Sequence, residues 1–281
     1  MKKRIALAQM CSGINVSDNA PMLREYLTLA ANQGAEMVFT PEMTGMMDCD
    51  RGRAKNTVCT EQDDIVLRTA QELANTHGFW INLGSLAILD EHGEDKRWVN
   101  RSFLIDPNGQ ISARYDKIHL FDVKLGSGEA YLESKAYRPG TKAVVAPVGD
   151  QNIGLTICYD LRFASLYASL AEAGADIITV PAAFTAPTGR AHWESLLRAR
   201  AIETASYVVA ATQCGEHADG RKTHGHSMVV DPWGEILLDM DQQLGIAICE
   251  IDFAKVQEVR EKIPALSNRR IFEKPMDKRA I

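Results

Sequence analysis

Long apolar runs and paired cysteines are both missing from this chain of 281 residues. No stretch approaches the roughly 18 apolar residues that a membrane helix requires. The six cysteines are scattered and form no C-x-x-C pair, which argues against a disulfide framework or a zinc cluster. The apolar run after the basic start, residues 1–5, is too short for a secretory signal. We therefore expect a protein of the reducing cytoplasm.

Positive charge is also scarce. The 31 lysines and arginines stand against 37 aspartates and glutamates, and the net charge of −6 argues against nucleic-acid binding. We find no G-x-G-x-x-G after a strand and no P-loop, and His224-x-His226 has no third metal ligand at a suitable spacing. The sequence predicts no cofactor and no metal. The expected partner is a small molecule, with neither nucleic acid nor membrane.

Short apolar strands alternate with amphipathic helices along the chain, and 46% of the residues are hydrophobic. Such a chain can bury one large core, which predicts a single domain over residues 1–281. One helix is predicted to begin at a capping box, Thr60-x-x-Asp63, and to end at Gly78.

Two pairs of segments resemble each other. Residues 103–111 and 228–236 are both predicted hairpins around a Pro/Gly turn, and residues 34–41 and 174–181 both read as a helix stop followed by a buried strand. Two α/β halves bury most apolar surface when their bare sheet faces pack together, with helices outside. We predict a four-layer α-β-β-α sandwich with two-half pseudo-symmetry; chance similarity of common turn motifs is the alternative.

Cys158 is one candidate reactive group. It follows the predicted strand 153–157 and precedes the predicted helix 163–173. Backbone N–H groups and the helix dipole at such a place favour a thiolate and can hold an oxyanion. The alternative is a small buried hydrophobe, because most free cysteines are buried for packing.

Charged residues at the other candidate positions are harder to explain by packing. Glu42 follows a predicted strand where the other half has Ala182, and carboxylates are rarely buried without a partner or a task. Lys117 lies among large apolar residues, so it either reaches water or is paired inside. His119 is the base that a Cys/His protease hypothesis would choose, and we rank it below Glu42.

Three segments together resemble the signature segments of the nitrilase superfamily, in the same order along the chain: Pro41-Glu42, Tyr115 to Leu120, and Ile157 to Phe163. The resemblance covers essentially the whole chain. It implies the sandwich already inferred, hydrolysis of a carbon–nitrogen bond, and dimers that join two sandwiches through helices.

The resemblance also implies a role for each matching residue. Cys158 corresponds to the nucleophile, Glu42 to the general base, and Lys117 to the cation that stabilises the oxyanion together with the backbone N–H of Tyr159. Glu133 corresponds to a further glutamate that supports the site. Attack on an amide carbonyl would then give a thioester, which water activated by Glu42 hydrolyses.

Residues 181–185, 188–189, 191–194 and 197–203 resemble a branch of amidases acting on small acids, and residues 211–215 and 224–234 indicate the substrate within that branch. Deaminated glutathione is the favoured substrate and 2-oxoglutaramate the first alternative. A nitrile, an N-carbamoyl amine, or a non-catalytic scaffold role are the others. The tentative substrate-binding residues are Phe184, Thr185, Arg162 and Arg190.

Two departures from the superfamily pattern lie beside the predicted site. Ala164-Ser165 replaces the common Pro-Glu after Phe163, and the loop 43–51 differs from the usual continuation after the catalytic glutamate. Both bear on substrate identity. A dianionic substrate needs cations in its pocket, and Arg162, Arg190 and Lys124 lie nearest to the motifs in sequence.

Overall fold

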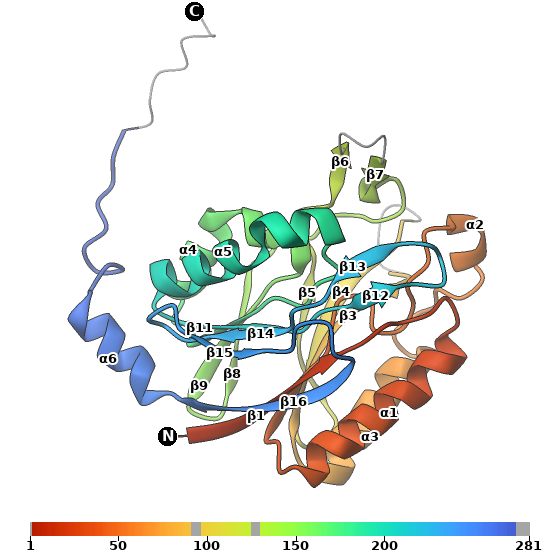
Figure 1. Cartoon of the computed structure of the whole chain (residues 1–281), viewed down its shortest axis with the longest axis horizontal. Helices are drawn as coiled ribbons and strands as arrows, with labels where there is room; N and C mark the ends of the chain where they lie inside the picture. The colour runs from red at the N-terminus through yellow and green to blue at the C-terminus, as the bar shows by residue number, and fades with distance from the viewer. Residues whose placement is uncertain (1, 91–96, 125–129, 274–281) are drawn as a thin grey trace, which may run out of the picture.

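The computed structural model of the chain describes residues 2–90, 97–124 and 130–273. Two six-stranded sheets pack face to face, and helices cover the outer face of each sheet (Figure 1). The predicted four-layer α-β-β-α sandwich is therefore confirmed. Within the described ranges, no helix is both long and apolar enough to cross a membrane.

The first sheet has the order β16-β1-β2-β3-β4-β5, and helices α1 and α3 cover its outer face (Figure 1). Strands β1, β2 and β3 are parallel, and each remaining strand is antiparallel to its neighbour. The elements are β16 (Gly245–Asp252), β1 (Lys2–Gln9), α1 (Val16–Asn32), β2 (Met37–Phe39), α3 (Ile65–His77), β3 (Trp80–Ile88), β4 (Val99–Ile105) and β5 (Ile111–Asp116).

The second sheet repeats this pattern in the order β8-β9-β10-β11-β14-β15, with α4 and α5 outside it. Strands β9, β10 and β11 are parallel, and the outer strands are antiparallel to their neighbours. The elements are β8 (Val144–Val148), β9 (Gln151–Leu155), α4 (Ala164–Glu172), β10 (Ile177–Thr179), α5 (Ala186–Thr204), β11 (Tyr207–Ala210), β14 (Met228–Val230) and β15 (Ile236–Asp239).

The matching orders support the two-half pseudo-symmetry read from the sequence echoes. The similar segments 103–111 and 228–236 form the hairpins β4-β5 and β14-β15. The second pair of segments supplies the central strands β2 and β10, each preceded by a glycine with a positive φ, Gly34 at 73° and Gly174 at 90°. Because the halves are equivalent, the C-terminal ends of their parallel strands reach the same end of the sandwich.

Short elements gather at that end, where Figure 1 shows α2, β12 and β13. They are α2 (Arg51–Ala54), β6 (Asp122–Lys124), β7 (Ala130–Leu132), the 3₁₀ turns η1 (Glu133–Lys135) and η2 (Cys158–Arg162), β12 (Cys214–Glu216) and β13 (Lys222–His224). Helix α6 (Ala254–Lys262) follows β16 at the opposite end.

The central strands bury both faces. In β1, Ile5 and Leu7 pack between the two sheets, whereas Ala6 and Ala8 pack against the layer of α1 and α3. Side chains alternate between the two faces of a strand, so a strand covered on both sides reads as one continuous apolar run. This explains why the sequence shows short apolar runs in place of an alternating pattern.

One predicted helix boundary is wrong. Helix α3 begins after Asp64, whose side chain accepts hydrogen bonds from the N–H groups of Val66 and Leu67, both at 2.8 Å. The hydroxyl of Thr60 donates to Asp63 instead. Asp64 caps the helix because its carboxylate can satisfy two otherwise unpaired N–H groups. The predicted end is correct, since Gly78 adopts a φ of 69°.

Candidate active site

A cavity of about 240 Å³ opens at the end of the sandwich that carries the short elements. Its lining includes Glu42, Lys117, Glu133 and Cys158. Glu42 follows β2, Lys117 follows β5, Glu133 opens η1, and Cys158 opens η2 after β9. The fold thus brings together the four side chains on which the sequence interpretation rests, from both halves of the chain.

Two glycines allow the backbone to pass close to these side chains. A Cβ on Gly84 would lie 2.1 Å from the carbonyl oxygen of Thr40 and 2.3 Å from that of Pro41, directly before Glu42. A Cβ on Gly140 would lie 2.1 Å from the carbonyl oxygen of Asp116, directly before Lys117. Any side chain at either place would displace a backbone segment that holds a charged group of the site.

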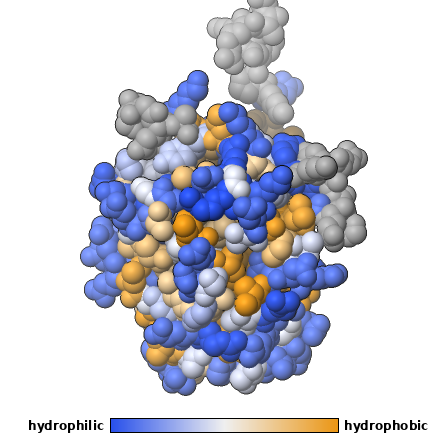
Figure 2. All heavy atoms as spheres, turned by 90° about the vertical axis from the view of Figure 1, so that its right-hand side faces the viewer, coloured by the Kyte–Doolittle hydropathy of each residue, from blue (hydrophilic) through white to orange (hydrophobic). Residues whose placement is uncertain are grey.

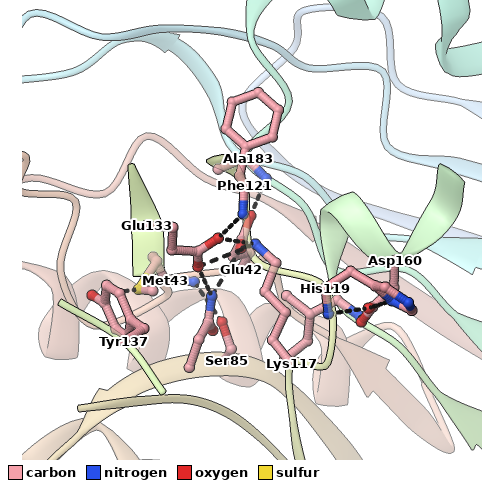
Figure 3. Close-up of polar contacts among 12 residues, drawn as sticks. Glu42, Met43, Ser85, Lys117, His119, Phe121, Glu133, Tyr137, Asp160 and Ala183 are labelled. Carbon is pink, nitrogen blue, oxygen red and sulfur yellow. Dashed lines mark hydrogen bonds and ion pairs between the residues drawn. The ribbon is translucent and has the colours of Figure 1, made fainter. Parts of the chain in front are cut away.

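Lys117 lies between two carboxylates. Its Nζ is 2.8 Å from Oε1 of Glu42 and 3.0 Å from Oε2 of Glu133, and its side chain is 2% exposed (Figure 3). Burial by itself lowers the pKa of the ammonium, but the charges of Glu133 and Glu42 outweigh it and raise the pKa well above the ordinary value. Lys117 is therefore a fixed positive charge.

Glu42 is held by three donors besides the thiol. Its Oε1 accepts from Lys117 at 2.8 Å and from Nδ2 of Asn100 at 3.0 Å, and its Oε2 accepts from the backbone N–H of Ala183 at 2.9 Å. Burial pushes the pKa of this carboxyl upward, yet the charge and hydrogen bond of Lys117 bring it below its ordinary value. Glu42 is therefore ionised at neutral pH.

The surroundings of Cys158 favour the protonated thiol. Burial, followed by the charge of Glu42, raises the pKa of the thiol well above its ordinary value, and the thiol donates a hydrogen bond to Glu42. Burial and the adjacent negative charge of Glu42 together outweigh the attraction of Lys117, so both oppose the thiolate that the sequence led us to expect. The pair is instead a thiol facing a carboxylate that can accept its proton, which is the requirement for a nucleophile activated by a general base.

The backbone at Cys158 is strained. Its φ is 49°, a left-handed conformation that L side chains rarely adopt, and its N–H donates to the carbonyl of Pro181 at 2.9 Å. Such strain persists only where the surrounding structure enforces it, and it is concentrated at functional sites. Cys158 lies at the turn between β9 and η2.

His119 lies outside this group. Its Nδ1 is 2.7 Å from Oδ1 of Asp160, and its ring stacks on Phe163 with the centroids 3.5 Å apart. Figure 3 shows His119 directed toward Asp160, away from Glu42 and Glu133. The Cys/His pair that the protease hypothesis needs is not formed. His119 instead belongs to a buried polar network under the Cys158 turn.

Asp160 is the centre of that network and was missed in the sequence. It accepts hydrogen bonds from the hydroxyl of Tyr115 at 2.6 Å, the N–H of Ile157 at 2.9 Å and the N–H of His119 at 3.0 Å. Asp160 thereby ties the residue before Cys158 to the segment around Lys117. A carboxylate two residues after the candidate nucleophile was the available signal.

Two buried amides were also missed. Nδ2 of Asn100 bridges the carboxylates of Glu42 and Glu133, at 3.0 and 3.1 Å. Nε2 of Gln213 donates to the carbonyl oxygen of Glu42 at 3.0 Å and to the hydroxyl of Ser12 at 2.8 Å. Both amides lie in or beside apolar strands, where an uncharged polar side chain needs partners. A polar amide within an apolar segment was therefore the feature by which the sequence could have identified both residues.

The tentative substrate-binding residues divide into two groups. Phe184 and Thr185 line the cavity, as predicted, whereas Arg162 and Arg190 are not among its lining residues. The guanidinium of Arg162 lies 5.5 Å from the centroid of the Phe184 ring, with Nη2 3.2 Å from Nδ1 of His192. Arg190 is exposed on α5. Both arginines were chosen because they lie near the motifs in sequence, and this criterion failed because neither residue lines the cavity.

Three other cations line the cavity: Arg51, Arg221 and Lys222. Arg221 Nε is 2.6 Å from Oδ2 of Asp219, and Nζ of Lys222 is 2.9 Å from Oε2 of Glu216. Lys124, the remaining candidate from the sequence, ends β6 and does not line the cavity. The lining also carries aromatic side chains, namely Trp98, Phe121, Tyr131, Tyr137, Tyr159 and Phe184.

Metal-binding groups are few among residues 2–90, 97–124 and 130–273. One set, Asp48, Cys49 and Asp219, brings possible ligand atoms within 4.8 Å of one another. Both carboxylates already have cationic partners, since Arg53 binds Asp48 at 2.7 Å and Arg221 binds Asp219 at 2.6 Å. The set is therefore an ion-pair cluster on the rim of the cavity.

Residues 4–261 match the family model described as carbon-nitrogen hydrolase. The chain belongs to this family. It is 41% identical over 274 residues to the deaminated glutathione amidase of Synechocystis sp., covering 96% of this chain and 99% of that protein. It is 37% identical over 273 residues to the human deaminated glutathione amidase, covering 95% and 82%. This carbon–nitrogen hydrolase acts on carbon–nitrogen bonds other than peptide bonds.

Solved structures of related proteins have the same fold. The crystal structure of the Caenorhabditis elegans NitFhit protein matches with a TM-score of 0.87 and 34% identity, covering 99% of this chain and 69% of that chain. The Saccharomyces cerevisiae Nit3 structure, described as a member of branch 10 of the nitrilase superfamily, matches with a TM-score of 0.85 and 25% identity, covering 96% and 97%. The hydrolase therefore has the nitrilase-superfamily fold.

Proposed function

We propose that this carbon–nitrogen hydrolase is an amidase that cleaves deaminated glutathione, with Cys158, Glu42 and Lys117 as its catalytic residues. The observation that carries the proposal is that Cys158, Glu42 and Lys117 line one cavity, with the buried ammonium of Lys117 2.8 Å from Glu42. The relatives that are deaminated glutathione amidases support the choice of substrate. The whole chain, 1–281, acts as one domain, as a homodimer in the cytoplasm.

The first half of the reaction forms a thioester. Sγ of Cys158 attacks the amide carbonyl while Glu42 accepts the thiol proton, so the new C–S bond forms as negative charge moves to the substrate oxygen. Lys117 and the backbone N–H of Tyr159 stabilise this oxyanion. Glu42 then gives its proton to the amide nitrogen, the C–N bond breaks, and the amine leaves.

The second half regenerates the enzyme. Glu42 takes a proton from water as the water oxygen attacks the thioester, and collapse of the second tetrahedral intermediate breaks the C–S bond. The proton returns to Cys158. With deaminated glutathione, the acyl product is 2-oxoglutarate and the amine product is cysteinylglycine. No redox change and no co-reactant other than water is needed.

The charges explain why Lys117 has two carboxylate partners. In the resting site its ammonium is shared between Glu42 and Glu133. When Glu42 takes the thiol proton it becomes neutral, so one of the two attractions on Lys117 weakens at the moment when the oxyanion appears. Lys117 then interacts with the new anion without leaving Glu133. Stabilisation that strengthens only in the transition state is the kind that accelerates a reaction.

Product analysis distinguishes the four candidate substrates. Purified protein is incubated with deaminated glutathione, 2-oxoglutaramate, an aliphatic nitrile and an N-carbamoyl amino acid, and acids and amines are quantified by mass spectrometry. We expect the highest kcat/KM for deaminated glutathione. Faster turnover of another compound would retain the amidase chemistry and replace the substrate. Turnover of none, by a folded protein, would favour the scaffold alternative.

A further inference from the structure

The catalytic end of the cavity has an excess of negative charge. Glu42 and Glu133 are both within ion-pair distance of Lys117, so two carboxylates surround one ammonium. A substrate that carries carboxylates of its own is repelled by this excess. Binding of such a substrate therefore needs a further cation in the cavity, beyond the catalytic group.

Two of the remaining cavity cations already have partners. Arg221 binds Asp219, whose Oδ2 also accepts from the N–H of Cys49 at 2.9 Å. Lys222 pairs with Glu216, and both of these side chains are 65% exposed. A cation that is already neutralised by a carboxylate attracts an anionic ligand weakly.

Arg51 differs from these two. Its Nη2 donates to the carbonyl oxygen of Leu132 at 2.5 Å, and the part of the chain that the structure describes supplies no carboxylate within ion-pair distance of it. The side chain is exposed at the mouth of the cavity, on the α2 side, which is the side of the molecule turned toward the viewer in Figure 2. Hydrogen bonds from Ser134 and, more weakly, the charge of Arg51 lower the pKa of Asp122 against the effect of burial, but Asp122 forms no ion pair with Arg51. The guanidinium can therefore still bind a ligand.

The backbone contact fixes Arg51 relative to the catalytic group. Leu132 directly precedes Glu133, so one short segment binds Arg51 through a carbonyl and Lys117 through a carboxylate. The guanidinium is thus anchored in the wall that also orients the catalytic ammonium. An arginine held by a single hydrogen bond keeps other N–H groups free for a carboxylate, which it can bind through two parallel bonds.

We propose that Arg51 is a specificity-determining residue that binds a carboxylate of the substrate while the amide reaches Cys158. The inference rests on the proposed function. Deaminated glutathione has a carboxylate at each end, one on the 2-oxo acid and one on the glycine, and either can be the group that Arg51 binds. Arg51 opens α2, at the end of the segment 43–51 that follows Glu42 in the sequence.

The test compares Arg51→Met and Arg51→Lys with the wild type. Lys55→Met is the matched control, because Lys55 directly follows α2, is exposed and does not line the cavity. We expect Arg51→Met to raise KM for deaminated glutathione about tenfold, with little change in kcat, and Arg51→Lys to restore part of the loss. The control should retain the wild-type KM.

A second substrate identifies which carboxylate is bound. 2-Oxoglutaramate shares the 2-oxo acid end and lacks the glycine. An equal rise in KM for both substrates assigns Arg51 to the 2-oxo acid carboxylate, and a rise for deaminated glutathione alone assigns it to the glycine carboxylate. Unchanged KM values for both substrates in Arg51→Met would overturn the inference.

Failure of the proposed function gives a different result, because the wild type itself would then leave deaminated glutathione intact. In that case, calorimetric titration of the wild type and Arg51→Met with 2-oxoglutarate and with cysteinylglycine decides the matter. Weaker binding of either product to the variant supports the carboxylate site. Equal binding to both proteins, or no binding to either, would overturn it.

Discussion

The carboxylate of Glu133 lies 3.0 Å from the ammonium of Lys117 and also accepts the backbone N–H of Phe121 at 2.6 Å. Glu133 therefore has its own backbone anchor and binds Lys117 as a second carboxylate beside Glu42. We infer that Glu133 is a positioning residue, which acts on the substrate only through Lys117.

Glu133→Gln should lower kcat about ten- to a hundredfold and change KM little, because Lys117 would lose the partner that keeps it in place during the transition state. The substitution also removes the charge that does most to raise the pKa of Lys117. The alkaline limb of the pH–rate profile should therefore move to lower pH. A fall in kcat with an unmoved alkaline limb would assign Glu133 a structural role only.

The pH dependence distinguishes Glu42 from a histidine base. Glu42 must be ionised, and its pKa is below its ordinary value; Cys158 must carry its proton, and its pKa is well above its ordinary value. Between roughly pH 5 and 8, kcat/KM should be constant, and on the acid side it should fall only when Glu42 is protonated. An acid limb centred near the ordinary histidine pKa of about 6.5 would contradict this assignment.

His119 gives a separate test of the same point. Its ring binds Asp160 and stacks on Phe163, so His119→Asn should lower the melting temperature and leave kcat within about tenfold of the wild type. Loss of a general base costs typically 10²- to 10⁴-fold, and Glu42→Gln should show a loss of that size. Thermal unfolding and steady-state kinetics on both variants make the comparison. Equal losses of kcat in the two variants would indicate that His119 is a catalytic residue.

Gly84→Ala should destabilise the protein by about 1–3 kcal/mol and reduce activity, because the new Cβ would clash with the carbonyl of Pro41 directly before Glu42. Gly13→Ala is the matched control, since its Cβ would meet only Oδ1 of Asn19 at 3.8 Å. Urea unfolding gives the free energies. A Gly84→Ala protein as stable and active as the control would show that this close approach is not required.

Much of this site could be predicted because its charged groups follow predicted strands. Glu42 and Cys158 follow parallel strands of the two halves, and pairing the halves by their echoes brings those strand ends together. Lys117 was readable as a cation among large apolar side chains, which either reaches water or is paired inside. Its place beside Glu42 and Cys158 was implied by the resemblance to the nitrilase superfamily.

The predictions that failed concern features that depend on the direction of a side chain and on the charges around it. Arg162 and Arg51 are both arginines near a motif, and only the three-dimensional path of the backbone decides which one faces the cavity. The protonation of Cys158 depends on the balance of two opposite charges close to it. Asn100 was visible as a polar residue within an apolar strand, but its bridge between two carboxylates needs coordinates.

The most direct test of the account is turnover of deaminated glutathione by the wild type and by a folded Cys158→Ala protein, with 2-oxoglutarate and cysteinylglycine both quantified. The wild type should release the two products in equal amounts, and Cys158→Ala should release neither above background. Release of both products by the variant at a rate close to that of the wild type would contradict the cysteine mechanism, because no thioester could then form at this position.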